Sequence, residues 1–474
     1  MPSPENAVTV KKSRTPTFAS SLTALLIAVG ILIYGVAVLQ QNPHVVLLFS
    51  CAVLLSYGLF LGVPWETMRA SIIKSISESI ETMLIICLIG ILVGVLIASG
   101  TVPTIIYYGL HVFSPKWFLP SVVILCSIMS ITTGSSWTTI GTIGVAFIGI
   151  GYGMNIPIGM TAGAIICGAY FGDKQSPVSD STNFAAAVAK TDLYDHTRSM
   201  IWSTAPAFLA SLMLFFFISM GYQSGSVDES QILVIAAGIQ TVFRIHAVLL
   251  IPLVLMLIMI IKKMPAILTL MIAIGLGVLE MMLFQRQSIS QVLQYMYTGF
   301  AANTGVEAVD HLLTRGGLLS MTGTVALMFM SLMMAGLMQS TGIMDQILSR
   351  LNKITKTRFS LIAVTLLSCV LLSYFAADPY LAMLIPANVL GKKYDEIGLH
   401  RSVLSRTLED GATIICPMVP WGTNGIYCAN ALGISVYTYL PYYYMGFLTP
   451  VFSLLLAATG IGCRKAVKEK IKNE

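Results

Sequence analysis

WFLPSVVILCSIMSITTGSSWTTIGTIGVAFIGIGYGMNIPIGMTAGAIICGAYFG is the sequence from Trp117 to Gly172, and it contains no aspartate, glutamate, lysine or arginine. A bilayer crossing needs about 20 mostly apolar residues, so this run can hold two or more crossings joined by turns. Within it, Ser130 to Thr139 (SITTGSSWTT) forms a polar interruption. Such an interruption at membrane depth must line a cavity or be buried in protein, because non-helical backbone cannot face lipid.

The rest of the chain has the same apolar character. Of its 474 residues, 56% are hydrophobic and 10% are charged, whereas soluble domains carry roughly 25% charged residues. We therefore predict an all-α polytopic membrane protein with about eleven to thirteen spans. This composition excludes a soluble enzyme, a disordered chain and a coiled coil, and the two-residue alternation of a membrane barrel is absent. Further uncharged runs cover residues 15–65, 83–115, 199–227, 317–344, 359–377 and 411–463.

Basic residues predict the topology and exclude one class of partner. Lys11, Lys12 and Arg14 precede the first apolar run, and five basic residues follow the last: Arg464, Lys465, Lys468, Lys470 and Lys472. By the positive-inside rule both termini face the cytoplasm, which requires an even number of spans, about twelve. No basic cluster is interleaved with aromatic residues, so we expect no nucleic-acid partner. The eight cysteines lack paired spacings and predict no disulfide or zinc framework.

Two stretches of sequence about half a chain apart resemble each other. Pro177 is followed by Thr182-Asn183 and Pro417 by Thr423-Asn424, with acidic residues shortly before each proline. Upstream, residues 130–139 lie opposite residues 373–382 (SYFAADPYLA). Duplicated halves with interrupted spans are typical of secondary transporters whose discontinuous helices meet near the bilayer midplane. We expect repeat cores at 117–205 and 358–446, scaffold spans at 1–116 and 206–357, and a last span end with a basic cytoplasmic tail at 447–474.

The interruptions carry the side chains that could bind a cation. Sodium prefers several hard oxygens, and the segment from Asp173 to Asn183 offers carboxylates, hydroxyls and an amide. We interpret it as the tip of a re-entrant hairpin, packed closely through Gly168 and Gly172; an exposed loop is the alternative. The candidate sodium ligands are Thr133, Ser135, Ser136 and Thr138; Asp173, Ser176, Ser179, Asp180, Thr182 and Asn183; Asp378; and Thr423 and Asn424.

Coupling to protons requires a group that holds either a proton or a metal ion. A partly buried aspartate has this property, because burial favours its neutral form and a bound cation favours its charged form. We rank Asp180 first because hydroxyl and amide side chains flank it, followed by Asp173 and Asp378; a solvated helix end is the alternative for Asp378. The motifs HExxH, GxSxG and GxxxxGK[ST] are missing, so we expect no enzyme activity, no cofactor and transport driven by ion gradients.

Four stretches resemble the NhaC-type Na+/H+ antiporters of the ion transporter superfamily: GTVPTIIYYGL (100–110), TTGSSWTTIGT (132–142), GAYFGDKQSPVSDSTNFAAAVAKTDLYDH (168–196) and LHRSVLSRTLEDGATIICPMVPWGTNG (399–425). This resemblance extends from about residue 80 to 445. It implies an elevator-type transporter in the cell membrane with two inverted structural repeats, each carrying a re-entrant hairpin and a discontinuous helix. It also implies sodium extrusion against proton entry. One branch of that family exchanges malate plus protons for lactate plus sodium, and other members move amino acids.

Several alternatives stay open at this point. Gly422 replaces the amide residue that the resemblance predicts after Pro-Trp, which leaves the transported species less determined than the fold. A co-transported small organic acid and a homodimer are both compatible with the family. A sodium-coupled symporter of a carboxylate or amino acid is the alternative function, in which helix N-termini and Lys174 or Arg406 hold the anion. A channel is disfavoured, because the polar breaks lack a repeated carbonyl ring.

Overall fold

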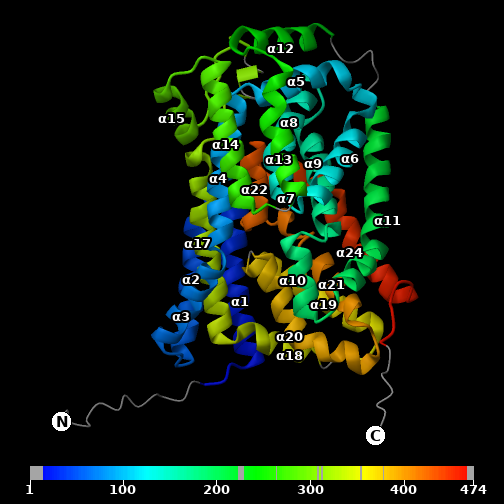
Figure 1. Cartoon of the computed structure of the whole chain (residues 1–474). Helices are drawn as coiled ribbons and strands as arrows, with labels where there is room; N and C mark the ends of the chain where they lie inside the picture. The colour runs from blue at the N-terminus through cyan, green and yellow to red at the C-terminus, as the bar shows by residue number, and fades with distance from the viewer. Residues whose placement is uncertain are drawn as a thin grey trace, which may run out of the picture.

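The computed structural model describes residues 14–221, 229–262, 264–306, 309–310, 313–352, 355–376 and 378–466. These residues form an elongated bundle of helices (Figure 1). Apart from the helices they contain two isolated β-bridges, Phe300–Arg315 and Leu399–Lys465. The predicted all-helical class is therefore confirmed for the described part of the chain. Lys11, Lys12 and the basic residues after 466 lie outside it.

The first half of the chain consists of α1 to α11, with two π-helical turns. Their bounds are α1 Phe18–Ile33, η1 Tyr34–Val38, α2 Pro43–Phe60, α3 Trp65–Glu78, α4 Ile80–Ala98, α5 Thr101–Val112, α6 Pro115–Thr133, α7 Ser136–Thr139, η2 Ile140–Gly144, α8 Val145–Gly153, α9 Ile158–Gln175, α10 Asp180–Ala189 and α11 Leu193–Met220. Prolines begin α2 and α6, where the missing N–H costs no hydrogen bond.

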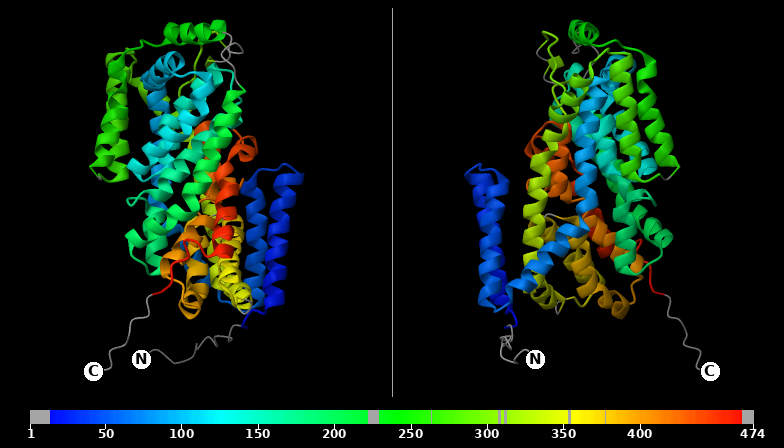
Figure 2. Two further views of the ribbon diagram at one scale, coloured as in Figure 1. Left: turned by 90° about the vertical axis from the view of Figure 1, so that its right-hand side faces the viewer. Right: turned by 60° about the vertical axis from the view of Figure 1, so that its left-hand side comes forward.

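The second half runs from α12 to α24. Its elements are α12 Glu229–Val242, η3 Ala247–Leu250, α13 Ile251–Ile261, α14 Ala266–Leu283, α15 Ile289–Thr298, α17 Leu318–Thr341, α18 Ile343–Asn352, α19 Arg358–Ala376, α20 Pro379–Ile397, α21 Arg401–Gly411, η4 Cys416–Met418, α22 Thr423–Leu432, α23 Val436–Tyr439, η5 Leu440–Tyr442 and α24 Tyr444–Thr459. The hairpin of α1 and α2 and the hairpin of α13 and α14 stand on opposite sides of the bundle (Figure 2).

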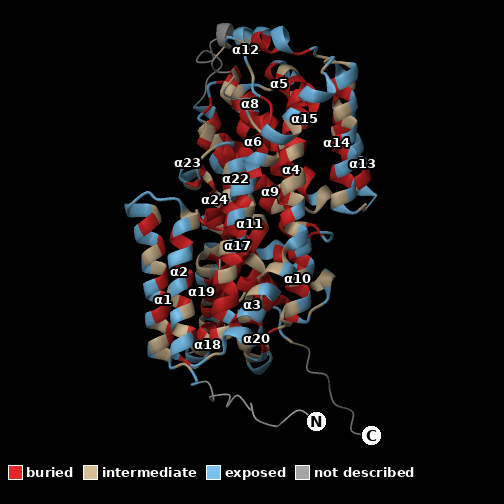
Figure 3. Cartoon of the chain, turned by 90° about the vertical axis from the view of Figure 1, so that its left-hand side faces the viewer, coloured by how far each residue is buried: buried red, intermediate tan, exposed pale blue. Residues whose placement is uncertain are grey.

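The outer helices have the surface expected of a membrane protein. Among the described residues, eight helices are long and apolar enough to cross a bilayer, or up to ten if each of two bent pairs counts as one span. Buried residues fill the centre of the bundle (Figure 3), while large apolar side chains such as Leu26, Phe49 and Met271 are exposed on its outside. The count of about twelve spans stays a prediction, because the remaining crossings would have to be built from helices that are interrupted.

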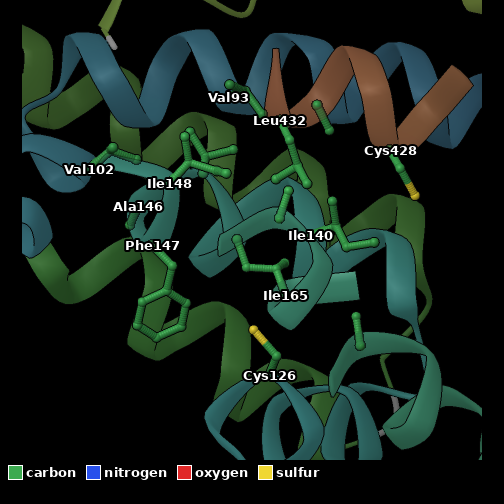
Figure 4. Close-up of a cluster of buried hydrophobic side chains, with 14 of the residues drawn as sticks. Val93, Val102, Cys126, Ile140, Ala146, Phe147, Ile148, Ile165, Cys428 and Leu432 are labelled. Atoms are coloured by element: carbon green, nitrogen blue, oxygen red, sulfur yellow. The ribbon is translucent and has the colours of Figure 1, made fainter. Parts of the chain in front are cut away.

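Two large hydrophobic clusters fill the bundle, and each combines residues from both halves of the chain. The first cluster is built mainly from α4 to α9 and also takes Tyr427, Cys428 and Leu432 of α22 (Figure 4). The second is built mainly from α1, α2 and α17 to α21 and also takes Ala185 and Ala189 of α10. Each cluster therefore joins the two halves of the chain.

The glycines of α9 allow it to pack closely on α6, as their spacing predicted. A Cβ atom on Gly168 would lie 2.4 Å from the carbonyl oxygen of Val123, and one on Gly172 would lie 2.4 Å from that of Ser127. Backbone atoms at this distance cannot move aside without separating the two helices. Close approach through small residues is the usual means of packing helices in lipid, where no hydrophobic force draws them together.

We predict that Gly172→Ala lowers the free energy of unfolding by about 1–3 kcal/mol, because the added methyl group pushes α6 away. The measurement is the apparent melting temperature of the detergent-solubilised protein. Gly275→Ala is the matched control, since a Cβ on Gly275 of α14 has no atom within 4 Å. Equal melting temperatures for the two variants would show that the contact between α6 and α9 tolerates a methyl group.

Candidate functional site

A cavity of about 130 Å³ lies where four helix interruptions meet. The interruptions are those between α6 and α7, between α9 and α10, between α19 and α20, and between α21 and α22. The remaining wall is formed by Glu78, Ser79, Thr82 and Ile85 near the junction of α3 and α4, and by Met328 of α17. Residues from both halves of the chain thus surround one polar cavity in the interior of the bundle.

The interruption after α6 is shaped by Gly134. This residue closes α6 with a positive φ of 67°, and a Cβ there would lie 2.9 Å from the backbone of Val178. The backbone then turns, and Ser135 caps α7 by accepting a hydrogen bond from the N–H of Thr138 at 3.1 Å. Glycine is the residue that adopts this conformation without steric cost. The predicted polar interruption is therefore a break between two helices.

Asp378 occupies the equivalent position between α19 and α20. Its Oδ1 accepts a hydrogen bond from the N–H of Leu381 at 2.9 Å, and the residue is 6% exposed. An acidic N-cap is favourable because the first N–H groups of a helix have no partner within the helix. Asp378 is therefore a buried carboxylate at a helix start that lines the cavity, and not a solvated helix end.

The segment after α9 differs from our interpretation as a hairpin tip. Gln175 ends α9, Asp180 begins α10, and α10 continues below α9 without returning along it (Figure 1). The sequence had no feature that fixed the direction of the chain after Pro177. The helix ends because Pro177 disfavours the α conformation in Ser176, which is extended with ψ of 124°, and α10 then packs on α20 and α21. This segment is one interrupted helix path.

Asp173 is the most closely held carboxylate at the site. Ser136 Oγ donates a hydrogen bond to its Oδ2 at 2.6 Å, and Ser179 Oγ donates to its Oδ1 at 2.5 Å. The residue is 8% exposed. Hydrogen bonds to a charged acceptor are roughly twice as strong as neutral ones. The two serines therefore join the break after α6 to the break after α9 through one carboxylate.

Asp180, which we ranked first, is exposed. It lines this cavity and two adjoining cavities of about 280 and 370 Å³. Asp173, Asp180 and Asp378 line the same cavity, yet no group of three or more histidine, cysteine or acidic side chains in the described residues is close enough to hold one metal ion. A cation here would be held by one carboxylate together with hydroxyl and backbone oxygens.

The other candidate ligands divide into two groups. Ser135, Ser136, Ser179, Thr423 and Asn424 line the cavity with the three aspartates, and Thr133 and Thr138 line the adjoining one. The remaining three side chains are bonded to backbone oxygens instead: Ser176 to Ile131, Thr182 to Lys174, and Asn183 to Ser179. Gly422 is the N-cap of α22 and is not among the residues that line this cavity.

Two aromatic residues at the site had not been predicted. Trp137 Nε1 and Tyr170 OH each donate a hydrogen bond to Asn424 Oδ1 at 2.7 Å. Trp137 also stacks on Tyr427, with ring centroids 4.5 Å apart. Since the indole nitrogen is only a donor, these bonds fix the amide with its oxygen toward the rings. Trp137 lies within the polar interruption, which could have identified it, whereas Tyr170 lies in an apolar run and had no such signal.

Lys174 and Arg406, which the symporter alternative assigns to an anion, do not line the cavity. Lys174 forms an ion pair with Asp410, and both side chains are completely buried. Arg406 is also completely buried and donates to the carbonyl oxygen of Gly462 at 3.0 Å. Both cations are therefore engaged within the protein.

Interrupted helices that enclose an acidic, hydroxyl-lined cavity inside a multi-pass helical bundle are typical of a secondary transporter. Residues 168–461 match the Na+/H+ antiporter family. The chain is 35% identical to the Na+/H+ antiporter NhaC of Alkalihalophilus pseudofirmus over 450 residues, covering 95% of this chain and 97% of the relative. The chain belongs to the Na+/H+ antiporter family.

Two other relatives have names that differ in the species transported. The malate-2H+/Na+-lactate antiporter of Bacillus subtilis is 34% identical, covering 95% of this chain and 96% of the relative. The arginine/ornithine antiporter ArcD of Halobacterium salinarum is 32% identical, covering 94% of this chain and 93% of the relative. The names of these relatives therefore give more than one kind of transported species.

Proposed function

We propose that this protein is a secondary active transporter that exchanges Na+ for H+ across the cell membrane. The observation that carries the proposal is the cavity in which Ser136 and Ser179 hold the Asp173 carboxylate. Hard cations are bound by carboxylate, hydroxyl and carbonyl oxygens, and all three are present at these helix breaks. Family membership supports the choice of Na+ and H+ as the transported ions.

The experiment is reconstitution of the purified protein into vesicles, with internal pH and internal sodium read at the same time. An imposed Na+ gradient should drive protons in the opposite direction, and an equal K+ gradient should not. A vesicle preparation without sodium-dependent proton movement would remove the proposal. Movement of a labelled carboxylate or amino acid in the same direction as sodium would favour the symporter alternative.

Two inverted structural repeats are the second part of the proposal. Ser135 and Asp378, which cap α7 and α20, are 243 residues apart. Inversion is supported by the placement of α6 to α8 in the upper part of Figure 1 and of α19 and α20 in the lower part. Five pairs of helices begin with this same spacing of 243 residues: 115 and 358, 136 and 379, 158 and 401, 180 and 423, and 193 and 436.

An elevator-type movement is consistent with the composition of the cavity wall. The four interruptions supply one side, and the α3–α4 junction and α17 supply the other. We take α6 to α10 and α19 to α22 as the unit that carries the cation, with α6–α7 and α19–α20 as re-entrant hairpins. The remaining spans are the scaffold. The basic residues near both ends support cytoplasmic termini, and a homodimer stays a prediction.

Exchange of a small organic acid, such as malate or lactate, is favoured by one detail of the cavity. Because the amide oxygen of Asn424 accepts from Trp137 and Tyr170, the amide nitrogen is the part left to a transported molecule. An amide N–H₂ group is a donor and suits a carboxylate. Among the relatives, the malate-2H+/Na+-lactate antiporter supports this extension. Adding candidate acids to the sodium-loaded vesicles tests it directly.

We predict that Asp180→Asn raises the Na+ concentration for half-maximal transport by about tenfold without loss of folded protein. Asp180 is exposed and lines three cavities, so its charge attracts the cation through partly solvated space and is worth about 1–2 kcal/mol. Initial transport rates over a range of Na+ concentrations provide the measurement. Complete loss of exchange would instead make Asp180 the coupling residue, as the sequence alone had indicated.

A further inference from the structure

Glu409 is a buried carboxyl group that the cation site does not use. It lies in the last turn of α21 and is 0% exposed. Neither Oε1 nor Oε2 has a hydrogen-bond partner among the described residues. A charged carboxylate removed from water without a donor or a counter-ion is very costly. The state of Glu409 that fits these surroundings is the neutral, protonated one.

The cations nearest to Glu409 are already engaged. Lys174 reaches from α9 to the neighbouring Asp410 and pairs with its Oδ1, which also accepts from Ser203 Oγ at 2.9 Å. Arg406 lies one turn earlier on α21, and its guanidinium is bound to carbonyl oxygens of Ser199 and Gly462. The ion pair of Lys174 and Asp410 is neutral as a unit. Lys174 acts electrostatically on Glu409 but is hydrogen-bonded to Asp410, so no cation is hydrogen-bonded to Glu409 within the described residues.

One side chain connects Glu409 with the cavity. Thr413 follows Glu409 by four residues, has its hydroxyl group near that carboxyl group without forming a hydrogen bond of good geometry, and lines the cavity. Its hydroxyl oxygen is buried and has no hydrogen-bond partner in the described part of the chain. A hydroxyl can donate and accept at the same time. Thr413 is therefore placed to pass a proton between water in the cavity and Glu409.

Building on the proposed function, we propose that Glu409 is the proton-binding residue of the exchange cycle, separate from the cation-binding site at Asp173. With Na+ at Asp173, its positive charge favours release of the Glu409 proton to a water molecule in the cavity. When Na+ leaves, the uncompensated Asp173 carboxylate repels a second negative charge, and Glu409 takes a proton from water. Opposite ions therefore alternate through electrostatic coupling between two carboxyl groups.

Other titratable groups on the elements packed around Glu409 are part of this balance. α21 itself packs on α10, α11, α19, α20 and α24. Lys174 and Asp173 lie on α9. Besides Asp410 and Arg406, the elements in contact with α21 and α21 itself carry Asp180 on α10, Tyr194, Asp195, His196 and Arg198 on α11, Arg358, Cys369 and Tyr374 on α19, Asp378 at the N-cap of α20, Tyr380, Lys392, Lys393, Tyr394, Asp395 and Glu396 on α20, Arg401 on α21, and Tyr444 on α24.

The test compares wild type, Glu409→Gln and a control in proteoliposomes, with two readouts. Exchange of radioactive for unlabelled Na+ at fixed pH measures the function of the cation-binding site. The Na+-driven change of internal pH measures proton movement. For Glu409→Gln we expect Na+/Na+ exchange within about twofold of wild type and Na+-driven proton movement reduced at least about tenfold. Glu396→Gln, on an exposed side chain paired with Lys393, should match wild type in both readouts.

Two results would overturn the proposal: wild-type proton movement in Glu409→Gln, or loss of both movements together. An infrared spectrum gives a further measurement that does not depend on transport. Wild type should contain a protonated-carboxyl band that disappears in Glu409→Gln and shifts in Glu409→Asp, and an unchanged band contradicts the assignment. The Asp variant also decides the question if the Gln variant does not fold. If wild type shows no Na+-driven proton movement, the proposed function fails, and the infrared comparison still decides whether Glu409 holds a proton.

Discussion

The Asp173→Asn variant should bind Na+ at least about 100-fold more weakly than wild type while it remains folded. The substitution removes the negative charge that Ser136 and Ser179 orient toward the cavity. A charge pair at about 4 Å is worth about 4 kcal/mol at an effective dielectric constant of about 20, which exceeds the 2.7 kcal/mol of a 100-fold change. Calorimetric titration of the purified protein with NaCl provides the measurement.

The control for this prediction is Glu66→Gln, since the Glu66 side chain is 76% exposed in its contact with Arg69. Ser136→Ala should give an intermediate loss of about tenfold, because Asp173 keeps its charge and loses one donor. Unchanged affinity for Na+ in Asp173→Asn would show that the cation-binding carboxylate is Asp180 or Asp378 instead. A variant that aggregates in detergent would assign Asp173 a structural role instead.

Lys174→Met should be among the most destabilising single substitutions in this protein, by about 3–5 kcal/mol, because it leaves Asp410 buried without its counter-ion. Asp410→Asn should have a similar effect, since it leaves Lys174 buried and charged. The double variant, Lys174→Met with Asp410→Asn, removes both charges and should recover most of the loss. Apparent melting temperatures of the four proteins form a double-mutant cycle that measures the coupling.

The exposed pair of Lys393 and Glu396 provides the matched comparison. Its side chains are 32% and 57% exposed, and exposed pairs contribute about 0–1 kcal/mol. Lys393→Met should therefore change the melting temperature little. If the losses of Lys174→Met and Asp410→Asn simply add in the double variant, the buried pair contributes no interaction energy, and the cost of each single variant comes from packing.

The membrane class and the place of the site could be predicted from the sequence because both depend on local composition. Runs without charge cannot lie in water, and polar interruptions within them have to line a cavity, which led to Ser135, Asp173 and Asp378. The match between Pro177 and Pro417 led to the predicted duplication, and its register differs by a few residues from the spacing of the helix starts. The helix starts place Asp180 opposite Thr423, whereas the motif had placed Thr182 there.

What could not be predicted depends on contacts between distant segments. Asp173 is more enclosed than Asp180 because the last turn of α9 faces the break after α6, and side-chain types do not reveal that direction. The pairing of Lys174 with Asp410 joins residues 236 positions apart. In the sequence, Tyr170 cannot be distinguished from any other aromatic residue of a lipid-facing or core helix. Its role follows from the hydrogen bond between its hydroxyl group and Asn424. Each of these features required the arrangement of the helices in space.

The packing of α10 in the second hydrophobic cluster, against helices from the other half of the chain, has a consequence for biosynthesis. The chain is made from its N-terminus, so α10 emerges from the ribosome long before α20 and α21, the helices that cover its alanine face. The first half must therefore wait in the membrane with that face uncovered until the ribosome has passed residue 411. Assembly of this protein is then completed after translation of its second half. A nascent chain released earlier exposes the alanine face of α10 to insertases and quality-control proteases.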